Sequence, residues 1–212
     1  MAAHGGVYNA TYNTGFAGSG NVPDGSTAGW SDTRSVSGAL FSYVTDVTVS
    51  FTVANGYNGD LYAYLSHNGI LVPLLNRVGT GNGDVFGFST SGFNNISLAD
   101  YGSLSIHGVE SPTAGPTYIP DGGHMSSFVN SSPNGNWTLF FADLSSDTGS
   151  RSQVTSWSLN LEGGITPVPE PVNVALGIFG GVFGLVIAVR SRAVRDRVQR
   201  CRDAFVHWVD AV

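Results

Sequence analysis

The sequence predicts an all-β domain, a β-sandwich or barrel, followed by one membrane-spanning helix. Three observations predict this class: apolar and polar residues alternate over residues 36–162, turn dipeptides punctuate the alternation, and an uncharged apolar run occupies residues 172–189. No long helical pattern occurs before residue 172. We expect an exported domain over 1–162 with its core at about 20–162, a Pro-rich linker over 163–171, a transmembrane helix over 172–189 and a tail over 190–212.

Several segments alternate with a period of two, which is the pattern of a strand with one buried face. In Asp46–Val53, every second residue is Val or Phe and the residues between are polar. The same pattern recurs over Asp60–Leu65, Trp137–Leu144 and Val154–Leu161. Turn dipeptides separate the strands at Asn55-Gly56, Asn58-Gly59, Asn68-Gly69, Asn82-Gly83, Asp121-Gly122 and Asn134-Gly135.

The charge distribution excludes one class of partner and indicates a topology. Residues 1–189 carry three Arg and twelve acidic residues, and residues 190–212 carry six Arg and three Asp. An acidic body cannot neutralise phosphates, so no nucleic-acid partner is expected. The single cysteine, Cys201, makes neither an intrachain disulfide nor a Cys-based zinc site, and we expect a small apolar role for it.

Residues 172–189 contain one polar residue, Asn173, and no charge. As a helix rising about 1.5 Å per residue, this run spans about 27 Å, close to the ~30 Å hydrocarbon layer of a bilayer. Two small-xxx-small pairs lie within it and indicate close contact with another helix, although Gly is also common in membrane helices in general. These glycines are Gly177, Gly180, Gly181 and Gly184.

The arginines that follow the span predict its direction, because positive residues favour the cytoplasmic side. They place the C-terminus in the cytoplasm and the large domain in the periplasm, outside a bacterial inner membrane. The first residues lack a basic segment and an apolar segment, so we expect that a signal peptide preceded Met1 and was removed.

The tail is predicted to be a short amphipathic cytoplasmic helix, with apolar residues spaced by three or four. Such a helix can lie in the headgroup layer, pack against a partner subunit, or be merely a solvated end. The anchoring residues are expected to be Arg190, Arg192, Arg195, Arg197, Phe205 and Trp208.

Two segments resemble the P/Homo B domain of proprotein convertases and bacterial exported proteins. They are NGDLYAYLSHNG (Asn58–Gly69) and PNGNWTLFFADLSSDTGSRSQVTSWSLNL (Pro133–Leu161). The resemblance covers roughly residues 20–162 and implies a jelly-roll β-sandwich. In the proteases that carry it, this domain is an appendage that stabilises a catalytic domain, and the sequence here shows no such domain.

The segment after the linker resembles a PEP-CTERM sorting signal, which implies export and recognition by an exosortase. The matching residues are Val168, Pro169, Glu170 and Pro171, followed by the apolar span and Arg-Ser-Arg. Such signals usually stop soon after the basic cluster, whereas this chain continues to Val212. That departure puts cleavage of the anchor in doubt.

No catalytic residues are predicted, because the five histidines occur in no metalloprotease spacing and no G-x-S-x-G is present. The P/Homo B resemblance implies calcium sites, and Asp60, Asp143 and Asp147 lie near loops of the matched motifs. Turn capping by the same aspartates is the alternative. Tyr62 and Tyr64 are either a sugar-binding face or a packing pair.

Two functions therefore remain open. The first is a non-catalytic, membrane-anchored structural or accessory subunit that stabilises or clamps a larger complex of integral membrane subunits in the lipid bilayer. The second is an exosortase-sorted cell-surface or biofilm protein that binds polysaccharide or other cells.

Overall fold

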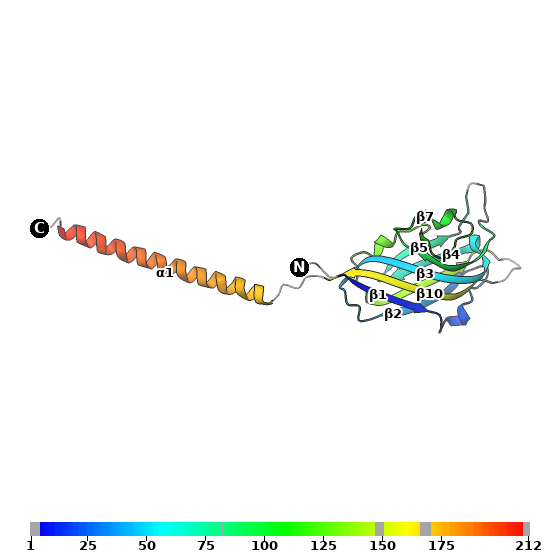
Figure 1. The fold of residues 1–212 in the computed structure, drawn as a ribbon, viewed down its shortest axis with the longest axis horizontal. Helices are drawn as coiled ribbons and strands as arrows, with labels where there is room; N and C mark the ends of the chain where they lie inside the picture. Colours follow the sequence, from blue (N-terminus) through cyan, green and yellow to red (C-terminus); the bar gives the residue numbers. More distant parts are fainter. Residues whose placement is uncertain (1–4, 82, 147–150, 166–170, 210–212) are drawn as a thin grey trace. The chain divides into compact units, whose positions relative to one another are not determined.

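The computed structural model describes residues 5–81, 83–146, 151–165 and 171–209, with helix side chains described from Ala175 to Arg202. The chain divides into two compact units, Met1–Thr166 and Pro167–Val212. The first is built from two β-sheets and the second contains one helix (Figure 1).

The first unit is a β-sandwich of a six-stranded and a four-stranded sheet. The larger sheet has the strand order β1-β10-β3-β6-β8-β7, and the smaller sheet the order β2-β9-β4-β5. Pairing is antiparallel except for β6 with β8 and β7 with β8. The strands are β1 (Gly6–Tyr12), β2 (Ser26–Val36), β3 (Tyr43–Tyr57), β4 (Leu61–His67), β5 (Ile70–Asn76), β6 (Ser91–Leu98), β7 (Leu104–Ser105), β8 (Thr117–Ile119), β9 (Gly135–Asp143) and β10 (Gln153–Gly164).

The predicted alternation is confirmed in the strands that form the centre of both sheets. In β3, the side chains of Val47, Val49, Phe51 and Val53 are buried, while those between them are partly exposed. The inward-facing residues of the two sheets meet in one apolar core, in which Phe51 contacts Phe141 edge to face at 5.2 Å. Burial of alternate side chains along the central strands therefore holds the sheets together.

The turn dipeptides have two different roles. Asn68 and Gly69 both have positive φ, 49° and 80°, and form the tight turn that joins β4 to β5. Asn55 and Gly56 also have positive φ, but they lie inside β3, where the register with β6 shifts between Val53 and Tyr57. The second pair therefore bends a long strand instead of ending it.

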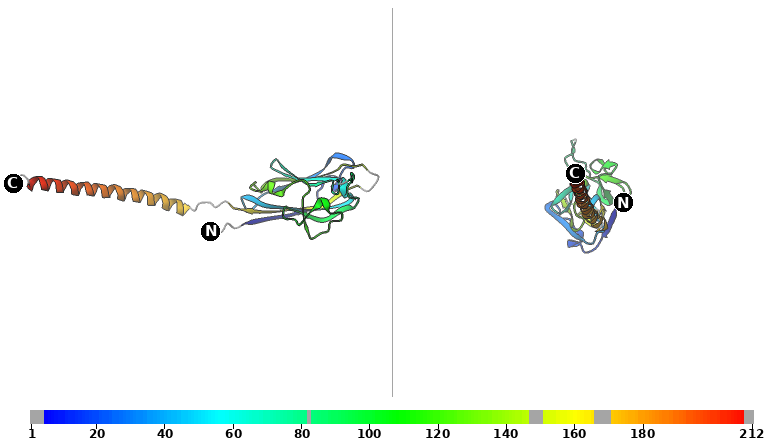
Figure 2. Two further views of the ribbon diagram at one scale, coloured as in Figure 1. Left: turned by 90° about the horizontal axis from the view of Figure 1, so that it is seen from above. Right: turned by 90° about the vertical axis from the view of Figure 1, so that its left-hand side faces the viewer.

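The second unit contains a single helix, α1 (Pro171–Val209), which Figures 1 and 2 show as one uninterrupted rod. The sequence predicts a boundary between a span and a tail helix at residues 189 and 190, and the structure has no break there. After Gly184 the segment holds neither Gly nor Pro, so nothing in it interrupts the backbone hydrogen bonds.

Candidate functional site

Among the described residues, about half of the exposed large apolar side chains lie on α1. Within Ala175–Arg202, an 18-residue stretch is long and apolar enough to cross a membrane, with a mean hydropathy of 1.5 and no part of it buried. The exposed apolar residues include Leu176, Ile178, Phe179, Val182, Phe183, Leu185, Val186, Ile187 and Val189. A helix that is apolar on every side requires an apolar environment.

The four glycines of α1 leave an open strip on its surface. A Cβ atom added at Gly177, Gly180, Gly181 or Gly184 would meet no neighbouring atom within 4 Å. Gly177 and Gly181 lie one turn apart, as do Gly180 and Gly184, so backbone is accessible along the strip. The geometry agrees with close approach of another helix, and the contact itself stays a prediction.

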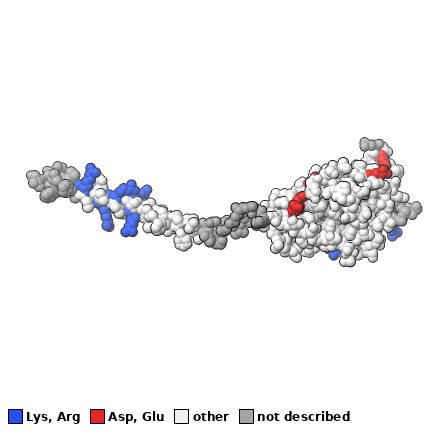
Figure 3. All heavy atoms as spheres, in the orientation of Figure 1, with Lys and Arg blue, Asp and Glu red and all other residues white. Residues whose placement is uncertain are grey.

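The predicted anchor arginines follow the apolar part of the helix. Arg190, Arg192, Arg195 and Arg197 are all exposed, and Figure 3 shows the basic side chains gathered on this part of α1. Phe205 and Trp208 belong to the helical backbone, but their side chains lie outside the described ones. The predicted apolar stripe of the tail therefore stays a prediction. Of the sorting motif, Val168, Pro169 and Glu170 lie outside the described residues, and Pro171 begins the helix.

Two of the three predicted calcium ligands come close together at one end of the sandwich. Leu61 pairs with Asp143, and the amide of Leu144 donates to the carbonyl of Asp60 at 2.9 Å. Both aspartates are buried, at 6% and 4% exposure. Asp143 accepts hydrogen bonds from Ser145 N and Ser152 Oγ. Asp147 lies outside the described residues, and within the described ones no three His, Cys, Asp or Glu side chains are placed to hold a metal. Calcium binding stays a prediction.

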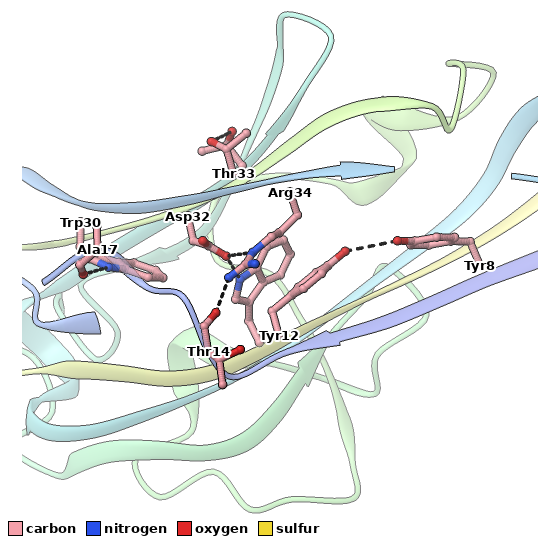
Figure 4. Close-up of polar contacts among 10 residues, drawn as sticks. Tyr8, Tyr12, Thr14, Ala17, Trp30, Asp32, Thr33 and Arg34 are labelled. Carbon is pink, nitrogen blue, oxygen red and sulfur yellow. Dashed lines mark hydrogen bonds and ion pairs between the residues drawn. The ribbon is translucent and has the colours of Figure 1, made fainter. Parts of the chain in front are cut away.

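A polar network that the sequence did not reveal joins the edges of the two sheets (Figure 4). Asp32 on β2 accepts hydrogen bonds at 2.7 Å from Trp157 Nε1 on β10 and from Arg34 Nε on its own strand. Arg34 also donates to the carbonyl of Thr14, and its guanidinium lies 4.9 Å from the Tyr12 ring centroid. Because β2 belongs to the smaller sheet and β10 to the larger, the buried carboxylate bridges them.

The phenol of Tyr12 in this network is held in its neutral form. Burial and then the hydrogen bond with Tyr8 raise the pKa of Tyr12 well above its usual range. The neutral ring packs on Trp157 with centroids 4.7 Å apart. The network is therefore a structural link between the sheets. No local sequence pattern indicates that Asp32 bonds to Trp157, which lies 125 residues later in the chain.

A second ion pair links the loops on the other side of the sandwich. His107 Nδ1 lies 2.7 Å from Asp121 Oδ2, and its Nε2 lies 2.8 Å from the carbonyl oxygen of Thr80. Hydrogen bonding to Asp121, opposed by burial and assisted by Thr80, raises the pKa of His107 above its usual value. With acceptors at both ring nitrogens, the imidazole has no free nitrogen with which to activate a hydroxyl nucleophile.

This pair predicts a pH dependence of stability. A pKa that is higher in the folded state means that protonated His107 stabilises the fold fully below its unfolded pKa, near 6.5. The contribution is lost as the pH rises from there through the folded-state pKa. Urea denaturation at a series of pH values is expected to show the midpoint falling over this interval, and His107→Gln is expected to abolish that fall. An unchanged pH profile in the variant would contradict the assignment, and His124→Gln, at an exposed site, serves as the control.

The remaining candidates are packed into the sandwich. His67 is buried and stacks on Trp137 with ring centroids 3.9 Å apart, and its ring nitrogens contact the carbonyls of Asn136 and Ser132. Tyr64 stacks on Phe140 at 4.6 Å with an angle of 13° between the planes. Each of these two ring faces therefore covers the other, which favours the packing interpretation of Tyr64 over a sugar-stacking one.

No protein-family model matches the chain, and no curated protein sequence does either. Among solved structures, the chain is similar to the serine protease of Aeromonas sobria in complex with its chaperone, at 16% identity over 76% of this chain with a TM-score of 0.48. A structure of the Aeromonas sobria serine protease gives 15% identity over 74% of the chain and a TM-score of 0.46. The match spans only 27% of each matched chain. The P/Homo B and PEP-CTERM resemblances stay predictions.

Proposed function

We propose that the chain is a single-pass membrane protein whose helix anchors a non-catalytic β-sandwich in the periplasm of a bacterium, where it serves as a structural or accessory subunit of a larger membrane complex. The observation that carries the proposal is the exposed apolar surface of α1, followed directly by arginines. The jelly-roll topology implied by the P/Homo B resemblance belongs to the same proposal.

Lipid is the partner that best suits this helix. The residues from Leu176 to Val189 expose large apolar side chains over more than half of the circumference, with the glycine strip on the remaining side, and a protein groove would cover only one face. The basic residues that follow would lie among anionic headgroups on the cytoplasmic side. The open glycine strip then offers a place for a second transmembrane helix, which is how an accessory subunit would hold its complex.

The single cysteine gives a direct test of topology. Cys201 is exposed and lies beyond the apolar segment of α1, so it should face the cytoplasm. In spheroplasts, a membrane-impermeant maleimide is expected to leave Cys201 unlabelled until the inner membrane is opened with detergent. A variant with Cys201→Ser and Ser37→Cys, which moves the thiol to an exposed loop of the sandwich, should be labelled without detergent.

Two outcomes would contradict the proposal. Release of the chain from membranes by alkaline carbonate would show that α1 does not span the bilayer. Labelling of Cys201 in intact spheroplasts would reverse the orientation.

The intact mass of the membrane-extracted chain separates the accessory role from the surface-sorting alternative. A full-length chain that co-purifies with integral membrane subunits in mild detergent supports the accessory role. A product cut near residues 168–171 supports recognition by an exosortase, display at the cell surface and binding of polysaccharide or other cells.

A further inference from the structure

A cavity of about 480 Å³ opens at one end of the larger sheet, between β3, β6 and the segment after β7. The residues that line it carry amides and hydroxyls and no charge: Asn55, Asn58, Asn94, Thr52, Thr90, Ser91 and Ser111. Val53, Phe93 and Pro112 add apolar surface. Both hydrogen-bond donors and acceptors are therefore present without any ionised group.

One lining side chain, Asn58, is buried and incompletely bonded. Its exposed fraction is 1%, and its Nδ2 donates to Thr90 Oγ1 at 3.1 Å. The Thr90 hydroxyl donates its own hydrogen to the carbonyl of Glu110 at 2.6 Å, so it can only accept from Asn58. This chain of bonds fixes the orientation of the amide and leaves Asn58 Oδ1 without a donor among the described residues. This oxygen is itself fully buried, so Asn58 shapes the wall of the cavity and costs the fold some stability.

The cavity continues into a polar face on the outside of the larger sheet, and this face ends at the acidic pair of Glu162 and Asp46. The strand register places Thr11, Ser158, Ser50 and Ser97 in one row across β1, β10, β3 and β6. The row on one side of it holds Asn9, Asn160 and Thr48. The row on the other side holds Ser156 and Thr52, and Thr52 also lines the cavity. With strands about 4.8 Å apart, four of them give a face about 14 Å across. These strands run across the face that Figures 1 and 3 show, which carries few charged side chains.

The chemistry of this face selects among partners. Some hydroxyls already pair: Ser50 with Ser97 on the neighbouring strand at 2.8 Å, and Thr48 with Tyr101, in the turn after β6, at 3.0 Å. No basic side chain lines the cavity to bind phosphate, and the rows contain no apolar anchor of the kind that dominates protein interfaces. Sugar hydroxyls both donate and accept hydrogen bonds, and so do the serine and threonine hydroxyls and the asparagine amides here.

We propose that the cavity and the adjoining outer face of β1, β10, β3 and β6 bind a neutral polysaccharide. One sugar residue would occupy the cavity and bond to its exposed polar side chains, Ser91, Asn94 and Ser111. The following residues would lie along the rows of Ser, Thr and Asn. This inference goes beyond the accessory role proposed above, and it holds or fails independently of the membrane topology.

Calorimetric titration of the full chain in lauryldimethylamine oxide tests the proposal, since glycoside detergents would themselves enter a sugar site. The probes are the hexasaccharides of cellulose, chitin, xylan, mannan and amylose, with hexagalacturonate as the charged counterpart. At least one neutral hexasaccharide is expected to bind with a Kd below about 1 mM, and hexagalacturonate at least ten-fold more weakly.

The variants locate the site. Ser111→Trp places a large side chain at the exposed rim of the cavity, and Thr11→Arg places a charge in the central row; each is expected to weaken binding at least ten-fold. Ser37→Trp, at an exposed serine outside both regions, should bind as the native chain does. The proposal is overturned if no neutral hexasaccharide binds, if the charged one binds as tightly, or if Ser37→Trp weakens binding as much as Ser111→Trp.

Discussion

Replacing Trp157 by alanine is expected to lower the free energy of unfolding of the sandwich by about 3 to 5 kcal/mol, the usual cost of deleting a buried indole. Trp157 is 1% exposed and packs on Tyr12. Its removal opens a cavity between the sheets and leaves the buried Asp32 carboxylate with the Arg34 donor but without the Trp157 one. Loss of that donor adds to the packing cost.

Trp157→Phe separates the two contributions. The phenyl ring fills most of the site but cannot donate to Asp32, so its expected cost is smaller, about 1 to 3 kcal/mol. Urea denaturation of the full chain in detergent, followed by the fluorescence of the buried Trp30 and Trp137, measures both variants. A loss below about 1.5 kcal/mol for the alanine variant would show that the core closes over the gap.

Gly20→Ala is expected to cost about 2 to 5 kcal/mol, because two effects combine at this position. Gly20 has a φ of +82°, a conformation that strains residues with a side chain. A Cβ there would also stand 2.0 Å from the carbonyl oxygen of Val154, which belongs to the backbone of β10 and cannot rotate away. Either β10 or the turn that precedes β2 must shift.

Gly18→Ala is the matched control, two residues away in the same turn. Gly18 also has a positive φ, +56°, but a Cβ there would meet nothing within 4 Å. Its expected cost is therefore only the backbone strain, about 1 to 2 kcal/mol. The difference in urea midpoint between the two variants measures the collision alone, and equal midpoints would contradict the predicted contact with Val154.

The sequence predicted the central strands and the apolar helix because each depends on a local pattern. The alternation in β3 and the run over residues 172–189 are legible without knowledge of what they pack against. Strand β1 was not predicted, since GVYNATY has few strongly apolar residues and owes its conformation to pairing with β10, about 150 residues later. Asn55-Gly56 was interpreted as a turn between strands because the dipeptide does not distinguish a hairpin from a bulge.

The candidate sites depend on contacts between distant residues, so the sequence indicated them only in part. Asp60 and Asp143 are brought together by the pairing of β4 with β9; the P/Homo B resemblance indicated the two aspartates but not this pairing. Neither the bridge from Asp32 to Trp157 nor the incomplete bonding of Asn58 has a local pattern. Both arise from the register of strands, and only the three-dimensional structure supplies that register.

The place of β10 in the larger sheet has a mechanical consequence. The chain leaves the sandwich from the end of β10, and this strand is hydrogen-bonded to β1 on one side and to β3 on the other. A pull along the axis of β10 loads the bonds of both ladders at the same time. Strand β1 lies at the edge of the sheet, and its only ladder is the one with β10. Under tension along its own axis, β10 should therefore resist extraction from the sandwich better than β1.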